Sequence, residues 1–126
     1  MIRILVVDDE IAILDEIAET LTEEGYGAVC VERVDAALDA LRNHSDINLV
    51  VTDLKMPGKT GANLINQARA EFERDITFLV MSGHGSPEVD PNGLKISEYP
   101  FLKKPLDVDQ LLKAVAKAVT QNQDGR

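Results

Sequence analysis

The sequence predicts an α/β domain in which helices cover both faces of a parallel sheet. Short apolar runs alternate with amphipathic segments along the chain, and this alternation is typical of a doubly wound parallel sheet. The length of 126 residues suits one compact domain with a sizeable core. No internal repeat or linker interrupts the pattern, so we expect residues 1–120 to form the domain and residues 121–126 a polar tail.

Five short apolar runs are expected to form the strands. The first is rich in β-branched residues and ends at acidic residues, as in a strand that is buried on both faces. The last is the weakest, and Pro100 before it suits an edge strand, where a missing backbone donor is tolerated. The runs are residues 4–7, 28–31, 49–52, 77–81 and 101–102.

Four amphipathic segments are expected to form helices, because their apolar residues recur at three- and four-residue spacing. Gly25 should end the first helix, and Asp107 with Gln110 resembles a capping box before the last. The apolar faces are Ile11, Leu14, Ile17, Ala18 and Leu21; Val34, Ala37, Leu38 and Leu41; Leu64, Ile65, Ala68 and Phe72; and Val108, Leu111, Leu112, Val115 and Val119.

The segment between the fourth and fifth runs is expected to form only a short, late-starting helix. Pro91 inside a helix would cost ~3 kcal/mol or more, and Gly93 up to another ~1 kcal/mol relative to alanine. The better start has Asp90 as the N-cap and Pro91 at the first helical position. That start leaves room for about two helical turns before Tyr99.

Composition and charge argue against several classes of function. Thirteen basic and 22 acidic residues leave a formal net charge of −9, which disfavours direct binding to nucleic acid or to an anionic membrane. No apolar stretch reaches membrane-spanning length, and the N-terminus has no room for a signal peptide before Asp8. The single cysteine, Cys30, is expected to be a small buried hydrophobe. We therefore expect a soluble, cytoplasmic protein.

Acidic residues follow two of the predicted strands. In open parallel sheets the functional site lies beyond the carboxyl ends of the strands. Asp8, Asp9 and Glu10 follow the first strand, where acidic residues can also simply begin a helix. Asp53 follows the third strand, where aspartate is an ordinary turn residue. If these strands are neighbours, the carboxylates converge and need a cation, and Mg²⁺ suits such oxygen ligands.

A hydroxyl and an ammonium group follow two further strands. Ser82 ends the fourth strand and could donate a hydrogen bond to a phosphoryl oxygen, although a serine–glycine sequence is more often a turn. Lys104 follows the fifth strand, and a lone lysine is usually a solvated surface charge. Beside a carboxylate cluster, however, its ammonium group would pair with a carboxylate or a phosphate.

Together these motifs resemble the receiver domain of two-component response regulators, from Ile2 to about Val119. The resemblance rests on residues 5–10, residues 52–58 with Gly61, residues 82–83 and residues 101–105. Each motif is moderately specific alone, but four in order at four strand ends are highly specific. The resemblance implies a flavodoxin-like (βα)₅ fold with strand order 2-1-3-4-5, for which a chemotaxis receiver is a known example.

The resemblance also implies a phosphoacceptor and a metal site. Asp53 would accept a phosphoryl group from a histidine kinase or a phosphotransfer protein. Asp8, Asp9 and Asp53, with the backbone carbonyl of Lys55, would bind Mg²⁺, with Mn²⁺ as an alternative ion. Lys55 and His84 occupy positions that flank the phosphoryl group in this family and vary with its lifetime.

Three further residues would bind or report the phosphoryl group, according to the same resemblance. Lys104 would pair with Asp53 or its phosphate, and Ser82 would move to contact a phosphoryl oxygen. Phe101 would be the aromatic residue whose rotamer reports that movement. Pro105 would have a structural role, because in this family it usually follows a cis peptide bond.

The implied function is a signalling switch rather than an enzyme with a separate substrate. Phosphorylation would change binding to an unknown downstream protein, and the chain would be a monomer or a phosphorylation-dependent dimer. We expect a single-domain response regulator, although an excised domain of a longer protein remains an alternative.

Three other functions are compatible with parts of the pattern. A flavin- or nucleotide-binding module would need a phosphate-binding loop after the first strand, where Asp8 and Asp9 would repel phosphate. A haloacid-dehalogenase-type phosphatase would need a second aspartate two residues after its nucleophile, where this chain has Lys55. A degenerate receiver that acts only as a scaffold is disfavoured, because all five expected site residues are present.

Overall fold

The computed structural model describes residues 2–83 and 98–124. His84 and the helix expected to begin at Asp90 therefore lie outside the described residues. In chain order the elements are β1 (Arg3–Val7), α1 (Ile11–Glu23), β2 (Gly27–Val31), α2 (Val34–Asn43), β3 (Leu49–Asp53), α3 (Gly61–Glu71), β4 (Thr77–Ser82), β5 (Phe101–Lys103) and α4 (Val108–Asp124).

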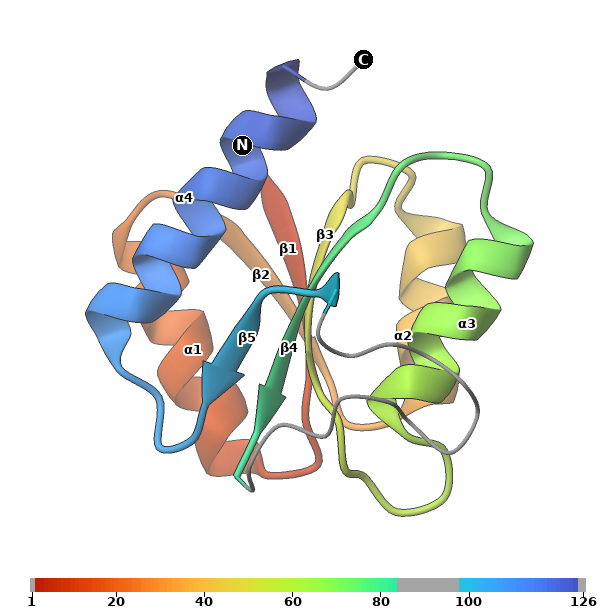
Figure 1. Cartoon of the computed structure of the whole chain (residues 1–126), viewed down its shortest axis with the longest axis horizontal. Helices are drawn as coiled ribbons and strands as arrows, with labels where there is room; N and C mark the ends of the chain where they lie inside the picture. The colour runs from red at the N-terminus through yellow and green to blue at the C-terminus, as the bar shows by residue number, and fades with distance from the viewer. Residues whose placement is uncertain (1, 84–97, 125–126) are drawn as a thin grey trace.

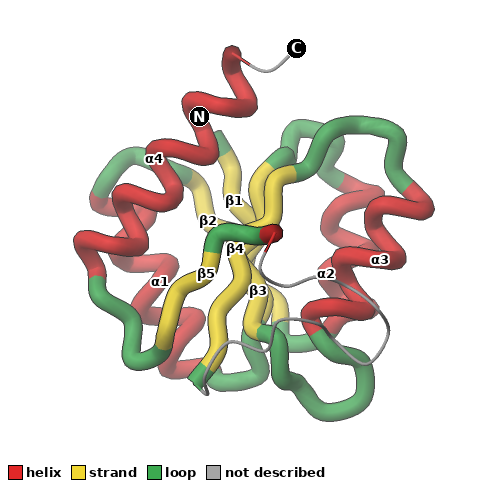
Figure 2. Tube along the Cα trace, in the orientation of Figure 1, coloured by secondary structure: helices red, strands yellow, loops and turns green. Residues whose placement is uncertain are grey.

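The five strands form one sheet in the order β2-β1-β3-β4-β5, and every pairing is parallel. Helices α1 and α4 cover one face of this sheet, and α2 and α3 cover the other (Figure 1). Figure 2 shows the same three layers, with the strands between the two pairs of helices. The structure thus confirms the predicted fold class and strand order.

The alternation of side chains along each strand divides the core into two clusters. Leu5 and Val7 of β1 face the side covered by α2 and α3, whereas Ile4 and Val6 face α1 and α4. All five residues of β3 are buried, because this strand lies at the centre of the sheet and is covered on both faces.

The parallel register brings the ends of the central strands together. Val7 pairs with Thr52, so Asp8 and Asp53 follow at neighbouring positions on the same edge of the sheet. At the other side of β3, Asp53 pairs with Met81. The fifth strand is a short edge strand, as predicted, and the backbone carbonyl of Pro100 accepts a hydrogen bond of 2.9 Å from Val80.

Helix α3 begins earlier than its apolar pattern alone indicates. Its N-cap is Thr60, whose hydroxyl accepts a 3.2 Å hydrogen bond from the backbone of Asn63. The side chain of Asn63 accepts a 2.8 Å hydrogen bond from the backbone of Thr60 in return. This capping box contains asparagine where glutamate or glutamine is usual, so the sequence offered only a weak signal for it.

Two further details differ from the sequence-based expectations. Cys30 is exposed rather than buried, because β2 is an edge strand in which no residue is fully buried. Its thiol lies 3.8 Å from the backbone carbonyl of Leu14 in α1. Helix α4 continues to Asp124, so residues 121–124 extend the helix into the expected tail.

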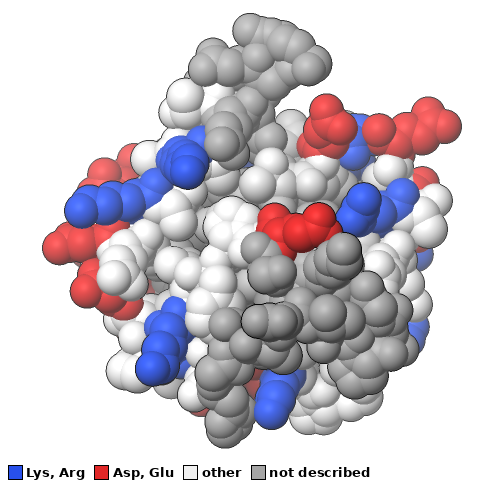
Figure 3. All heavy atoms as spheres, in the orientation of Figure 1, with Lys and Arg blue, Asp and Glu red and all other residues white. Residues whose placement is uncertain are grey.

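The described surface carries charges of both signs. On the face shown in Figure 3, the described lysine and arginine side chains form several separate groups, interspersed with acidic and uncharged atoms. Among the described residues, no helix combines the length and apolar composition that a membrane-spanning segment needs.

Candidate functional site

Two carboxylates are buried at the carboxyl end of the sheet. Asp8 is fully buried, and Asp53 is 5% exposed. The backbone N–H of Asp8 donates a 3.2 Å hydrogen bond to Val31, and its carboxylate accepts a 2.9 Å hydrogen bond from the backbone of Glu10. Asp8 is therefore held in place by the end of β2 and by the start of α1.

A third carboxylate, from the exposed residue Asp9, completes a cluster with these two. One carboxylate oxygen from each of Asp8, Asp9 and Asp53 lies within 4.8 Å of the others. Carboxylate oxygens are the ligands that Mg²⁺ prefers, and like charges this close are unfavourable without a cation. The donor set therefore fits the predicted metal site.

Lys104 brings a positive charge to the two buried carboxylates. Its ammonium nitrogen lies 2.7 Å from Asp8 Oδ2 and 3.4 Å from Asp53 Oδ2, and its side chain is 11% exposed. The Lys104 backbone donates a 2.9 Å hydrogen bond to the carbonyl of Ser82. The peptide bond between Lys104 and Pro105 is cis, as the family resemblance implies.

The burial of this cluster changes the protonation behaviour of its members. Burial raises the pKa of Asp53, the neighbouring charge of Asp8 raises it further, and Lys104 only partly offsets these effects. Burial alone would lower the pKa of Lys104, but the carboxylate of Asp8 2.7 Å away and the charge of Asp53 outweigh it, so the pKa is raised. Lys104 therefore remains a cation in the site.

Gly61 allows the chain to pass directly over Asp53. A Cβ atom at this position would lie 2.3 Å from the backbone oxygen of Asp53, which is closer than real Cβ contacts. The backbone N–H of Gly61 donates a 3.1 Å hydrogen bond to the carbonyl of Leu54. Glycine is thus needed here for close approach, and it fixes the backbone that carries Asp53.

The carboxylates open into a cavity of about 320 Å³, which is lined by Asp9, Glu10, Asp53, Lys55, Gly83 and Lys104. The Lys55 side chain is exposed at this cavity, and its backbone donates a hydrogen bond to the Asp53 carboxylate. Asp53 is thus accessible from this cavity, next to both lysines.

Ser82 and Phe101 lie on neighbouring strands beside the cluster. Ser82 is buried at the end of β4, and Phe101 is half-buried at the start of β5. Phe101 pairs with Val80 and packs against the core cluster on the α2 and α3 side. The structure thus places Ser82 at the edge that carries the carboxylates, and Phe101 two pairs before it along the same strands.

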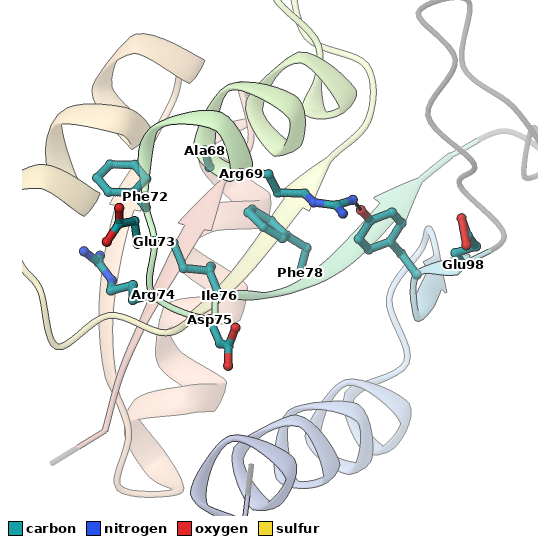
Figure 4. Close-up of a pocket in the computed structure, with 10 residues that line it drawn as sticks. Ala68, Arg69, Phe72, Glu73, Arg74, Asp75, Ile76, Phe78 and Glu98 are labelled. Carbon is teal, nitrogen blue, oxygen red and sulfur yellow. Dashed lines mark hydrogen bonds between the residues drawn. The ribbon is translucent and has the colours of Figure 1, made fainter. Parts of the chain in front are cut away.

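Another cavity, of about 480 Å³, lies near the start of β4, at the opposite end of the sheet from the carboxylates (Figure 4). Arg69 of α3 donates a 2.7 Å hydrogen bond to the hydroxyl of Tyr99 across it. The ring of Tyr99 packs edge-on against Phe78, with the centroids 6.5 Å apart. This cavity joins α3 to the segment before β5 and lies apart from the acidic cluster.

Glu10 makes a contact with Lys104 that was not predicted from the sequence. Its carboxylate Oε1 lies 3.4 Å from the Lys104 ammonium nitrogen, so it is a third acidic partner of this lysine. The acidic triplet that begins at Asp8 was visible in the sequence, but its third member looked like an ordinary helix start.

Comparison with known proteins agrees with this geometry. The profile of the response regulator receiver domain matches residues 4–116. The chain therefore belongs to the receiver domain family of two-component response regulators. Receiver domains are signalling domains, and in this family they act with histidine kinases and downstream effectors.

Two curated relatives illustrate the range of the match. The transcriptional regulatory protein FixJ of Bradyrhizobium diazoefficiens is 32% identical over 119 residues, which are 94% of this chain and 57% of FixJ. The chemotaxis protein CheY of Treponema pallidum is 28% identical over 93% of this chain and 82% of its own length. The chain thus spans little more than half of FixJ and only 33% of the Bacillus subtilis regulator YesN.

Solved structures show the same fold. A receiver domain from Clostridium thermocellum superposes with a TM-score of 0.83 at 25% identity, over 98% of both chains. The response regulator TrrA from Thermotoga maritima, solved in complex with Mg²⁺ and beryllofluoride, has a TM-score of 0.79 at 29% identity, over 93% of this chain and 98% of its own.

Proposed function

We propose that Asp53 is the phosphoacceptor of this receiver and takes its phosphoryl group from a phosphohistidine of a kinase or a phosphotransfer protein. The observation that carries the proposal is the position of Asp53, which is buried at a strand end within 3.4 Å of Lys104 and beside Asp8. A carboxylate with this access to a cavity is a feasible nucleophile for phosphoryl transfer.

In the transfer, a carboxylate oxygen of Asp53 forms a bond to phosphorus while the phosphorus–nitrogen bond of the donor breaks. The donor imidazole keeps the electron pair of that bond and takes up a proton from solvent. The product is a mixed anhydride, which water can hydrolyse, so the signal is reversible. Lys104 stays protonated throughout and compensates charge on the phosphoryl oxygens.

Asp8, Asp9 and Asp53, with the backbone carbonyl of Lys55, would hold Mg²⁺, and Mn²⁺ would fit the same oxygen donors. When bound, the ion would neutralise charge on the phosphoryl oxygens. Asp8 would offer its carboxylate to the ion in a fixed position, because the residue makes two hydrogen bonds with the backbone.

Ser82 would donate its hydroxyl hydrogen bond to a phosphoryl oxygen, and Phe101 would change its rotamer in response. This role is supported by the position of Ser82 at the same sheet edge and by the partial exposure of Phe101. Lys55 and His84 would modulate the lifetime of the phosphoryl group.

In this proposal the chain acts as a switch for an unknown protein partner, as a monomer or a phosphorylation-dependent dimer, and not as an enzyme with turnover. It would act in the cytoplasm as a single-domain response regulator.

The test is incubation with acetyl phosphate and Mg²⁺, followed by intact-mass measurement. The wild-type chain should gain one phosphoryl group, and Asp53→Asn should gain none. Asp75→Asn is the matched control, because Asp75 is an exposed aspartate near the opposite end of the sheet, and it should behave as the wild type. Equal phosphorylation of Asp53→Asn and the wild type would contradict the proposal.

A further inference from the structure

Glu10 is placed at the N-cap of α1, yet its side chain makes no capping hydrogen bond. Glutamate is a poor N-cap, and serine, threonine, aspartate or asparagine would satisfy the free N–H groups of the helix better. The side chain is 62% exposed and lies with its Oε1 3.4 Å from the Lys104 nitrogen. Its described contact is therefore with the functional lysine rather than with its own helix.

Lys104 forms ion pairs with three carboxylates. Its ammonium nitrogen lies 2.7 Å from Asp8, 3.4 Å from Asp53 and 3.4 Å from Glu10. The contact with Glu10 has the geometry of a hydrogen bond. A phosphoryl oxygen that binds Lys104 therefore competes with these carboxylates, and with Glu10 for a hydrogen bond.

The three carboxylates differ in the free-energy cost of losing their contact with Lys104. Asp8 is fully buried and Asp53 nearly so, and a buried carboxylate that loses its partner is costly. The Glu10 carboxylate is exposed, so water can solvate it as soon as Lys104 leaves. Glu10 is therefore the partner that Lys104 gives up at the lowest cost.

We propose that Glu10 is a positioning residue that holds the Lys104 ammonium group in the resting protein and is exchanged for a phosphoryl oxygen at Asp53. The inference rests on the proposed phosphoacceptor role of Asp53. Glu10 acts through Lys104, the residue that its carboxylate contacts. The Glu10 carboxylate competes with the phosphoryl group for Lys104. Removal of this carboxylate therefore strengthens the interaction between Lys104 and the phosphoryl group.

The test measures the affinity for beryllofluoride, a phosphoryl mimic, in the presence of Mg²⁺. Glu10→Gln should bind beryllofluoride up to about fivefold more tightly than the wild type, the factor that corresponds to an exposed ion pair. Glu19→Gln is the matched control, since it removes the same charge from the same helix at an exposed position nine residues further on, and it should leave the affinity unchanged.

Two further variants separate contact from simple charge repulsion. Glu10→Asp keeps the charge but shortens the side chain by one methylene, so it should bind beryllofluoride as tightly as Glu10→Gln. In a Lys104→Met background, Glu10→Gln should have no effect, because the residue acts through Lys104. The inference is overturned if Glu10→Asp behaves as the wild type, or if the effect of Glu10→Gln persists without Lys104.

A readout that needs neither metal nor phosphoryl group keeps the two proposals distinguishable. The Lys104 ammonium nitrogen lies 3.4 Å from Glu10 Oε1, so the NMR signals of the Lys104 side chain in the metal-free protein should shift in Glu10→Gln and Glu10→Asp, but not in Glu19→Gln. Unchanged Lys104 side-chain signals in both Glu10 variants would overturn the inference. If the wild type binds no beryllofluoride, the proposed function fails while the NMR comparison still decides the contact.

Discussion

At the carboxyl end of the sheet, the buried carboxylates of Asp8 and Asp53 share the ammonium group of Lys104. At the amino end, Arg74 instead lies among backbone carbonyls, and it donates hydrogen bonds of 2.9 to 3.3 Å to Leu41, His44 and Ile47. Leu41 lies in the last turn of α2, where carbonyls lack a partner further along the helix. The His44 carbonyl also accepts a 3.1 Å hydrogen bond from the backbone of Ile47.

Charged side chains have different effects at the two ends of the sheet. Arg74 satisfies polar groups that the fold exposes, so it stabilises the chain without any ligand. The carboxylates of the other end repel one another, and burial raises the pKa of Asp53. In this chain, the carboxyl end of the sheet thus holds an unfavourable charge distribution, whereas the charge at the amino end satisfies backbone carbonyls.

The largest effect is expected for Gly61→Ala at the carboxyl end. The new Cβ would lie 2.3 Å from the backbone oxygen of Asp53, and relieving this clash should lower the free energy of unfolding by about 3 kcal/mol. Urea denaturation would measure the loss, and phosphorylation should slow as well. Gly83→Ala is the control and should unfold as the wild type, because its Cβ would meet no atom of the described residues within 4 Å. An equal loss in both variants would contradict the close-approach argument.

The next effect is expected at the amino end, for Arg74→Ala. The loss of its hydrogen bonds to three carbonyls should lower the free energy of unfolding by about 2 kcal/mol. Phosphorylation of the folded fraction should be unchanged, because Arg74 is remote from Asp53. Arg69→Ala removes one exposed hydrogen bond to Tyr99 and should cost less than about 1 kcal/mol. Slower phosphorylation of folded Arg74→Ala would show that the two ends are coupled.

Mg²⁺ should stabilise the folded protein through the carboxylates at the carboxyl end of the sheet. At ten times its dissociation constant, the ion should raise the free energy of unfolding by about 1.4 kcal/mol, as binding linkage requires. Asp9→Ala should lose this gain and melt no lower than the metal-free wild type, because one repelling carboxylate is gone. Asp75→Ala should retain the gain. Calorimetry is the suitable measurement, since the chain has no tryptophan. A wild-type melting temperature that does not respond to millimolar Mg²⁺ would remove the metal site from the account.

The smallest effect is a pH-dependent gain in Asp53→Asn without metal. The pKa of Asp53 is raised in the folded state from its ordinary value of 3.8, so the folded protein binds this proton more tightly than the unfolded chain. The stability that this proton provides is lost as the pH rises from 3.8 through the folded-state pKa. Asp53→Asn should therefore melt above the wild type at pH 7, and the difference should shrink as the pH falls toward 3.8. A difference that is constant from acidic to neutral pH would argue against a raised pKa.

The same contrast explains how far the sequence could be used. The β-branched runs predicted the strands, and neighbouring parallel strands were enough to predict that Asp8 and Asp53 converge. The shortest contact of Lys104 is with Asp8 rather than with Asp53, which the sequence did not predict. Lys104 follows β5, which lies three strand spacings of about 4.8 Å from β1, so this contact depends on the path of a loop that has no periodic signal.

The sequence patterns also could not predict which strand lies at the edge of the sheet, or where two backbone segments come into close contact. The apolar run around Cys30 predicted burial, but a run of this kind does not reveal whether its strand lies at the centre or at the edge of the sheet. Gly61 belonged to the motif that indicated the family, yet its reason, contact with the Asp53 backbone, became visible only in three dimensions.

The most direct test of the central claim is to locate the phosphoryl group chemically. After incubation with acetyl phosphate and Mg²⁺, borohydride reduces an aspartyl phosphate to homoserine, which peptide sequencing by mass spectrometry can place. The account predicts homoserine at position 53, with intact aspartate at positions 8 and 9. Homoserine at Asp8 or Asp9, or a phosphorylated protein with no homoserine at position 53, would contradict it.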